Sequence, residues 1–232
     1  MKKLWTVAAA AVCVMTFLHA QPRAQKDSDE AKRIQDAATI FGEIMAAEDK
    51  SIPSAILGKA TGIAIFPSTI KAGLVIGGVR GRGILSGRTA DGWSSPAFLT
   101  LTGGSFGLQI GGEATDFVLL VMNEKGANSV MSSKVKLGAD ASAAAGPVGR
   151  TTSAETDVAM KAEILSWSRS RGVFGGISLS GSTLRSDDGA NKKIYGKELS
   201  AKEILKENTV KTPPSGAPLV EMLQQVSPKH AS

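Results

Sequence analysis

The sequence has few of the residues on which enzymes and metal centres most often depend. It contains one cysteine, Cys13, and two histidines, His19 and His230. One cysteine cannot form an internal disulfide, and cleavage after Ala20 would remove both Cys13 and His19, which leaves no cysteine metal site and His230 as the one imidazole. Aromatic residues make up 5% of the chain and do not alternate with basic residues, as stacking platforms for nucleic acid do. The sequence therefore predicts no metal, no cofactor and no nucleic-acid partner.

The first twenty residues predict export. Lys2 and Lys3 precede an apolar run that ends at Leu18, and Leu18-His19-Ala20 offers a cleavage site. The run is shorter than the about 20 apolar residues of a membrane-spanning helix. We expect removal of residues 1–20 and a periplasmic or extracellular location at a membrane surface. A retained anchor and lipidation at Cys13 are the alternatives.

Helical patterns come first in the remaining chain. Asp27-Ser28-Asp29-Glu30 resembles a capping box, and apolar residues then recur at helical spacing to about Lys50. The polar face of this predicted helix is net acidic, whereas helices that lie on membranes usually have a basic polar face. We therefore expect it to pack on the protein's own core. A second, short helix is predicted from Ser51 to Ala60.

From Thr61 to Leu184 the pattern changes to strands. Gly81 separates two strand-like runs and suggests a hairpin or a bulged bend there. Residues 117–122 are continuously apolar, which is typical of a strand buried on both faces. The sequence predicts an α+β fold with a mainly antiparallel sheet or barrel-like core and N-terminal helices packed on it. Residues 27–210 are the expected domain, followed by a Pro-rich linker and tail over 211–232.

Two stretches resemble enzyme or metal motifs. Gly103-Gly104-Ser105-Phe106-Gly107 has the form of a hydrolase elbow, but that chemistry needs a strand-to-helix turn and a histidine. Asp187-Asp188-Gly189-Ala190-Asn191 lacks the spacing and closing glutamate of an EF-hand loop, so we interpret it as a polar turn. We expect no catalytic residue and no metal site.

The segment from Lys71 to Gly83 is dense in glycine and holds three positive charges and no negative one. Glycine in a strand permits close approach of a ligand, and arginine suits phosphate. If Gly81 does not bulge, Arg80 and Arg82 point to one face about 7 Å apart. The segment predicts a sheet surface that contacts an anionic partner.

Several ordered strings resemble the SYLF domain family over about residues 31–195. They are Ile52-Pro53, Gly62-Ile63-Ala64-Ile65-Phe66-Pro67, Lys71-Ala72-Gly73, Gly77-Gly78-Val79-Arg80-Gly81, Trp93-Ser94-Ser95-Pro96-Ala97-Phe98, Gly111-Gly112-Glu113-Ala114-Thr115-Asp116, Lys136-Leu137-Gly138-Ala139-Asp140, Ala145-Gly146-Pro147 and Ser168-Arg169-Ser170-Arg171-Gly172-Val173-Phe174-Gly175-Gly176. The resemblance implies binding of phospholipids, especially phosphoinositides, through an amphipathic N-terminal region and basic residues. Some eukaryotic members bind actin, which we do not expect of an exported protein.

The first hypothesis is a non-enzymatic protein that binds anionic phospholipid at the cell envelope. Its candidate lipid-binding residues are Lys71, Arg80, Arg82, Arg88, Lys134, Lys136, Arg150, Arg169 and Arg171. The alternative for each arginine is an internal ion pair with Asp91, Glu113, Asp116 or Asp140. The alternative function is a structural or protein-interaction module of the envelope, and a hydrolase that uses Ser105 is the third hypothesis.

Overall fold

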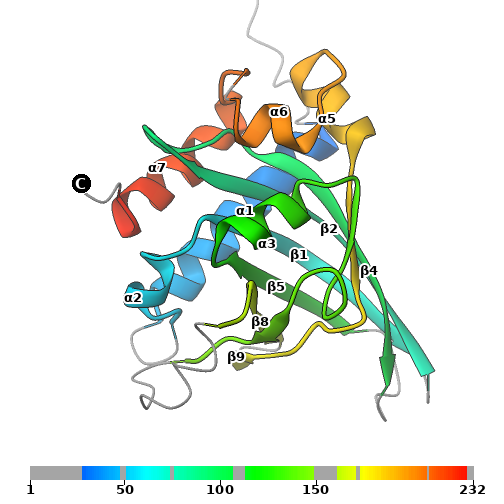
Figure 1. The fold of residues 1–232 in the computed structure, drawn as a ribbon. Helices are drawn as coiled ribbons and strands as arrows, with labels where there is room; N and C mark the ends of the chain where they lie inside the picture. The colour runs from blue at the N-terminus through cyan, green and yellow to red at the C-terminus, as the bar shows by residue number, and fades with distance from the viewer. Residues whose placement is uncertain are drawn as a thin grey trace, which may run out of the picture.

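A single curled sheet of long strands organises the protein. The computed structural model describes residues 28–47, 51–73, 76–106, 113–148, 161–170, 173–207 and 209–228. The strands of the sheet are β1 (Gly62–Gly73), β2 (Ile76–Thr89), β3 (Gly92–Trp93), β4 (Ala97–Phe106), β5 (Glu113–Val121), β6 (Lys134–Lys136), β7 (Ala143–Ala145), β8 (Ile164–Ser170), β9 (Val173–Gly176) and β10 (Thr183–Ser186) (Figure 1).

The strand order is β6-β10-β4-β2-β1-β5-β8-β7, with β3 beside β2 and β9 beside β8. The pair β7–β8 is parallel, and the other recorded pairs are antiparallel. The described helices are α1 (Asp29–Met45), α2 (Ser54–Leu57), α3 (Glu124–Val130), α5 (Asp188–Tyr195), α6 (Ala201–Leu205) and α7 (Ala217–Val226), with a 3-10 turn η1 (Pro214–Gly216). The predicted α+β class, with a mainly antiparallel sheet and a packed N-terminal helix, is confirmed.

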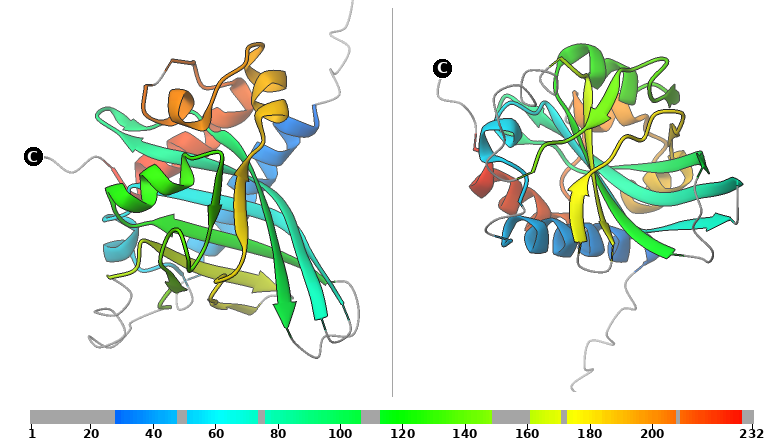
Figure 2. Two further views of the ribbon diagram at one scale, coloured as in Figure 1. Left: turned by 45° about the vertical axis from the view of Figure 1, so that its right-hand side comes forward. Right: turned by 90° about the horizontal axis from the view of Figure 1, so that it is seen from below.

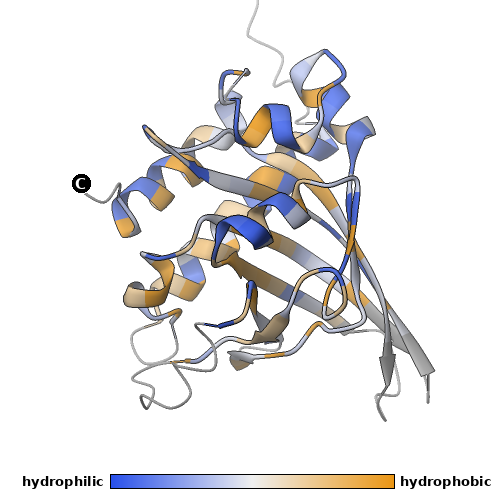
Figure 3. Ribbon diagram, viewed as in Figure 1, coloured by the Kyte–Doolittle hydropathy of each residue, from blue (hydrophilic) through white to orange (hydrophobic). Residues whose placement is uncertain are grey.

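Both faces of the sheet are apolar, and helices cover each of them (Figure 2). We call the first the α1 face; α1, α2, α5 and α7 pack on its buried side chains, which include Ile63, Ile65, Ile84, Phe98, Val118, Leu120, Leu165 and Trp167. We call the second the α3 face; α3 and α6 pack there on residues that include Ala64, Phe66, Leu85, Leu99, Leu101, Phe117 and Leu119. In Figure 3 hydrophobic residues colour the middle of the strands, whereas α3 is mostly hydrophilic on its visible side. The predicted double burial of residues 117–122 is confirmed.

Helix α1 begins and packs as its sequence predicts. The Ser28 hydroxyl accepts a hydrogen bond from the Ala31 amide and caps the first turn. Ile34 and Phe41 are fully buried against the sheet, so the apolar stripe of α1 belongs to the core. The helix ends at Met45, short of the predicted end near Lys50.

Two ion pairs, Arg33–Asp187 and Glu30–Lys193, connect the start of α1 to α5. The buried Arg33 donates to Asp187 at 2.9 Å and stacks on the Phe98 ring 5.0 Å from its centroid. Burial alone would raise the pKa of Glu30, but hydrogen bonds from its own backbone and from Lys193 lower that pKa. Because Asp187 also caps α5, one carboxylate joins the two helices.

Two local predictions were wrong. Strand β2 runs without interruption through Gly81 and pairs with β4 from Ile76 to Leu85, so there is no hairpin at that glycine. Residues 188–195 form a helix rather than a polar turn. Within residues 211–232, predicted as a Pro-rich linker and tail, α7 buries Leu219 and Leu223 against α1.

Two glycines on adjacent strands, Gly83 and Gly104, differ in the room that they leave for a side chain. A Cβ atom on Gly83 would lie 2.3 Å from the Ile65 carbonyl oxygen and 2.5 Å from the Phe66 ring, whereas one on Gly104 would have no neighbour within 4 Å. We expect Gly83→Ala to lower the free energy of unfolding by about 2–3 kcal/mol or more, because backbone blocks the new methyl group. Gly104→Ala should leave it unchanged or raise it by up to about 1 kcal/mol. Denaturant unfolding measures both; equal losses would contradict this account.

Candidate functional site

The long strands run past the helices, and their far ends carry exposed charges on the α1 face. In Figure 1 β1, β2, β4 and β5 continue to the lower right beyond α1. Near the helices the α1 face is covered, as the buried Ile84 of β2 and Phe98 of β4 show. Arg82 and Arg80, two and four residues before Ile84 on β2, point to the same face and are exposed.

The strand register brings further cations to this surface. Arg82 lies opposite Thr100 of β4, Thr100 opposite Arg185 of β10, and Arg185 opposite Lys134 of β6. A second row, one residue pair along, contains Arg80, Thr102, Thr183 and Lys136 in the same order. Directly paired residues share a face of the sheet. We call the five basic residues Arg80, Arg82, Lys134, Lys136 and Arg185 the cationic band.

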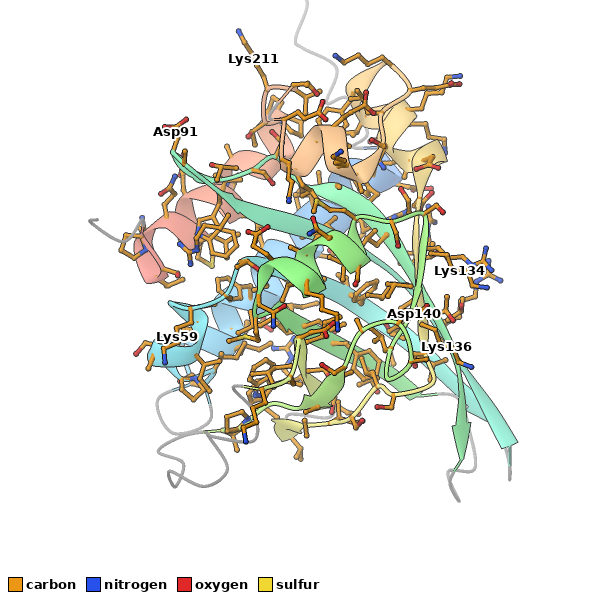
Figure 4. The ribbon with its side chains drawn as sticks, viewed as in Figure 1. Lys59, Asp91, Lys134, Lys136, Asp140 and Lys211 are labelled. Carbon is orange, nitrogen blue, oxygen red and sulfur yellow. The ribbon has the colours of Figure 1, made fainter. Side chains whose placement is uncertain are left out.

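The register also fixes the spacing of the charges. Neighbouring strands lie about 4.8 Å apart, so β6 and β2 are separated by about 14 Å across the band. The two rows lie about 7 Å apart along the strands. All five residues are exposed, and Figure 4 shows Lys134 and Lys136 together at one side of the molecule.

The cations of the band are unpaired within the described part of the chain, where every recorded ion pair involves other residues. Lys134 of β6 and Arg185 of β10 are direct partners on neighbouring strands. Like charges in such a pair destabilise the sheet. The nearby Asp140 accepts a hydrogen bond from the Lys136 amide, and Asp188 accepts one from the Ser186 hydroxyl. The band thus concentrates like charge where the fold gains nothing from it.

Small and hydroxyl-bearing residues surround these charges. Thr100, Thr102 and Thr183 lie between the cations of the two rows. Beyond the second row, Gly78 pairs with Gly104, and both are exposed. A Cβ atom at either position would meet nothing closer than 3.9 Å, and neither has positive φ. Packing and backbone conformation therefore do not require these two glycines.

Arg88, a predicted lipid ligand, is instead held by the protein's own groups. Its guanidinium donates to the carbonyl oxygens of Ala60 at 2.9 Å and Ser227 at 3.1 Å. It also stacks on Trp93, 4.4 Å from the ring centroid. Burial lowers the pKa of this guanidinium. Arg88 joins the end of α2 to the end of α7 and does not lie in the band.

Arg169 is also engaged internally. It donates two hydrogen bonds to Asp116, at 2.9 and 3.0 Å, and one to Glu43 of α1. Burial alone would lower its pKa, but the hydrogen bonds and charges of Glu43 and Asp116 raise it. This is the internal-pair alternative that the sequence left open.

The other predicted residues divide into two groups. Arg80, Arg82, Lys134 and Lys136 come together in the band. Arg150, Arg171 and the side chain of Lys71 lie outside the described residues. Sequence reasoning missed Arg185, a single basic residue in a four-residue strand, because only its pairing with β4 brings it to the site.

The enzyme-like motifs have structural places. Gly103 to Phe106 lie within β4 rather than at a strand-to-helix turn. In the segment 187–191, compared above with a calcium loop, Asp187 caps α5 and forms an ion pair with Arg33. The side-chain oxygen of Asn191 accepts a hydrogen bond from the Phe98 amide. Among the described residues, no three histidine, cysteine or acidic side chains gather as a metal site would require. Nor does a helix in the described ranges have the length and apolar character needed to cross a membrane.

Comparison with known proteins identifies the family. A family model described as "Ysc84: Las17-binding protein actin regulator" matches residues 102–226. The chain is 34% identical over 180 residues to Protein YSC84 of Saccharomyces cerevisiae, covering 76% of this chain and 38% of that protein. The chain belongs to the Ysc84 (SYLF) family. The resemblance predicted from the sequence strings is confirmed.

Other relatives agree with this assignment. LAS seventeen-binding protein 3 of Saccharomyces cerevisiae is 34% identical over 180 residues, which is 76% of this chain and 39% of that protein. Human SH3 domain-containing YSC84-like protein 1 is 32% identical over 205 residues, 87% of this chain and 59% of that protein. The chain thus matches between about two fifths and three fifths of each relative's length. Names in the family describe binding and regulatory proteins rather than enzymes.

The Arg88 network gives a test that distinguishes structure from binding. We expect Arg88→Gln to lower the free energy of unfolding by about 3 kcal/mol, because several carbonyl oxygens lose a charged donor. Arg82→Gln, in the band, should change it by no more than about 0.5 kcal/mol. Thermal and denaturant unfolding measure both. A fully stable Arg88→Gln protein would contradict the structural role of Arg88.

Proposed function

We propose that this protein is a non-enzymatic module that binds the surface of anionic phospholipid membranes through the cationic band. The observation that carries the proposal is the gathering of five exposed, unpaired cations from three strands on one face of the sheet. Three of the five cations, Lys134, Lys136 and Arg185, lie within the segment matched by the family model.

The geometry favours a surface over a small ligand. The charges are spread over about 14 Å across the strands. A single phosphate would contact only one or two of them, whereas an array of headgroups offers each cation a phosphate oxygen. Guanidinium groups of Arg80, Arg82 and Arg185 suit bidentate contact with such oxygens.

The expected affinity follows from the charge. Each basic residue near an anionic membrane contributes about 1 kcal/mol, and the attraction falls off within a Debye length of about 8 Å at physiological salt. Five cations acting together would give useful binding that weakens as salt rises. Because the side chains are exposed, they would need little rearrangement to reach the headgroups.

Helix α1 does not serve this proposal as a membrane helix. Ile34, Phe41 and Ile44 of its apolar stripe are buried in the core, and withdrawing them would expose the α1 face of the sheet. The basic residues rather than the N-terminal helix therefore carry the interaction.

The location we propose is the cell envelope, after export by the signal predicted at residues 1–20, which lie outside the described residues. An exported protein has no access to actin, so the partner we assign is the membrane. The names of the relatives nevertheless favour a second candidate, a module that binds another protein, for which the band would recognise an acidic surface.

Vesicle co-sedimentation tests the proposal. We expect binding to phosphatidylcholine vesicles that contain phosphatidylglycerol, weaker binding at high salt, and little binding to phosphatidylcholine alone. Arg82→Glu with Arg185→Glu should weaken binding at least about a hundredfold, since two attractions become repulsions. The pair is informative because only the folded sheet brings the two residues into one row, on either side of Thr100.

The matched control is Lys59→Glu with Lys211→Glu, which changes the net charge equally. Figure 4 places Lys59 and Lys211 away from Lys134 and Lys136. The control should retain most of the binding, and circular dichroism should show that both variants fold. Equal loss in the two double variants would indicate a net-charge effect. Undiminished binding of the Arg82/Arg185 variant, or no preference for anionic vesicles, would refute the proposal.

A further inference from the structure

A large apolar side chain projects beside the cationic band. Ile70 of β1 is 58% exposed. It pairs directly with Arg80 on one side and with the exposed Ala114 of β5 on the other. The second row of the band therefore continues from Lys136 through Arg80 to an apolar edge at Ile70. An isoleucine at this exposure contributes little to the core, so its position requires another explanation.

A β-bulge places Ile70 on this face. Between Ile65 and Ile70, β1 advances five residues while β2 advances four, from Ile84 to Arg80. The same extra residue appears against β5 between Phe66 and Thr69. One extra residue reverses the alternation of side chains. Without it, Ile70 would point to the α3 face, away from the cations.

The bulge is specifically held. Ser68 has a positive φ of 46°, an uncommon conformation for a residue with a side chain. Its amide donates to Asp116 at 2.9 Å, and Asp116 is itself fixed by Arg169. Beyond the bulge, the fully buried Thr69 occupies the space that Gly81 leaves on the α3 face. These five residues thus maintain the geometry that turns Ile70 outward.

Two glycines without side chains lie near Ile70 on the same face. The glycine pair Gly78 and Gly104 forms the next row on the same face, and side chains could be accommodated at both positions. Their absence leaves bare backbone that a bilayer can approach closely. Cations, bare backbone and one apolar side chain occur together on one exposed end of the sheet.

We propose that Ile70 is a membrane anchor. The bilayer lies against the end of the α1 face that the helices leave uncovered. There the cationic band contacts the phosphates of the headgroups, and Ile70 enters the apolar boundary beneath them. This inference rests on the proposed function. The five adjacent cations favour an anionic bilayer as the occupant over an apolar pocket of a protein. Electrostatic contact then orients the protein, and Ile70 adds a component of binding that salt does not screen.

The experiment compares Ile70→Ser with Val173→Ser. Val173 of β9 is 68% exposed and belongs to a strand that pairs with β8, so it is a matched apolar control away from the band. On vesicles of phosphatidylcholine and phosphatidylglycerol, Ile70→Ser should weaken binding about tenfold, and Val173→Ser should leave it unchanged. At high salt, the native protein should retain some binding to these vesicles, whereas the Ile70→Ser protein should retain almost none. Thermal unfolding verifies that both variants fold.

A second readout reports insertion directly. A solvent-sensitive fluorophore on Ile70→Cys, in a chain with Cys13→Ser, should shift to the blue and be quenched by brominated acyl chains. The same label on Val173→Cys should do neither. If Ile70→Ser binds like the native protein while Arg82→Glu with Arg185→Glu does not, the band is the site and the anchor is refuted. If the native protein does not bind anionic vesicles, both proposals fail.

Discussion

The structure depends on a mismatch between the length of its strands and the reach of the helices that cover them. Strand β2 has 14 residues and would extend over about 46 Å, whereas the 17 residues of α1 span about 25 Å. Only the covered part of the α1 face can be apolar at no cost in solubility. The uncovered part is mainly polar or charged, with Ile70 as the exposed apolar exception, and on β2 the buried Ile84 gives way there to the exposed Arg82 and Arg80. One strand thus serves the core at one end and solvent at the other.

Three arginine environments show how local partners decide the role of one residue type. Arg88 lies among carbonyl oxygens at the joint of α2 and α7, and Arg169 lies between carboxylates of α1 and β5. Arg185 has neighbours of its own sign and hydroxyl groups. The first two stabilise tertiary contacts, and the third is left available. Composition and net charge do not distinguish these environments.

Much of the architecture followed from local patterns. The capped amphipathic α1 and the doubly buried β5 could be predicted because the residues that determine them lie close together in the sequence. The site could be predicted only in part. Arg80 and Arg82 share a strand, so period two placed them together, but Arg185 joins them through a register between strands far apart in sequence. The bulge at Ser68 depends on Asp116, 48 residues away, which no local signal indicates.

The contact between Arg88 and Ser227 spans 139 positions of the chain. It has a consequence for biogenesis. During synthesis the whole sheet emerges before α7. Until that last helix arrives, the α1 side chains that pack on α7 stay uncovered, and Arg88 lacks the Ser227 oxygens that accept its hydrogen bonds. Packing of the α1 face is therefore completed last, when α7 is available, and an export step of the kind proposed above would act on the chain before that closure.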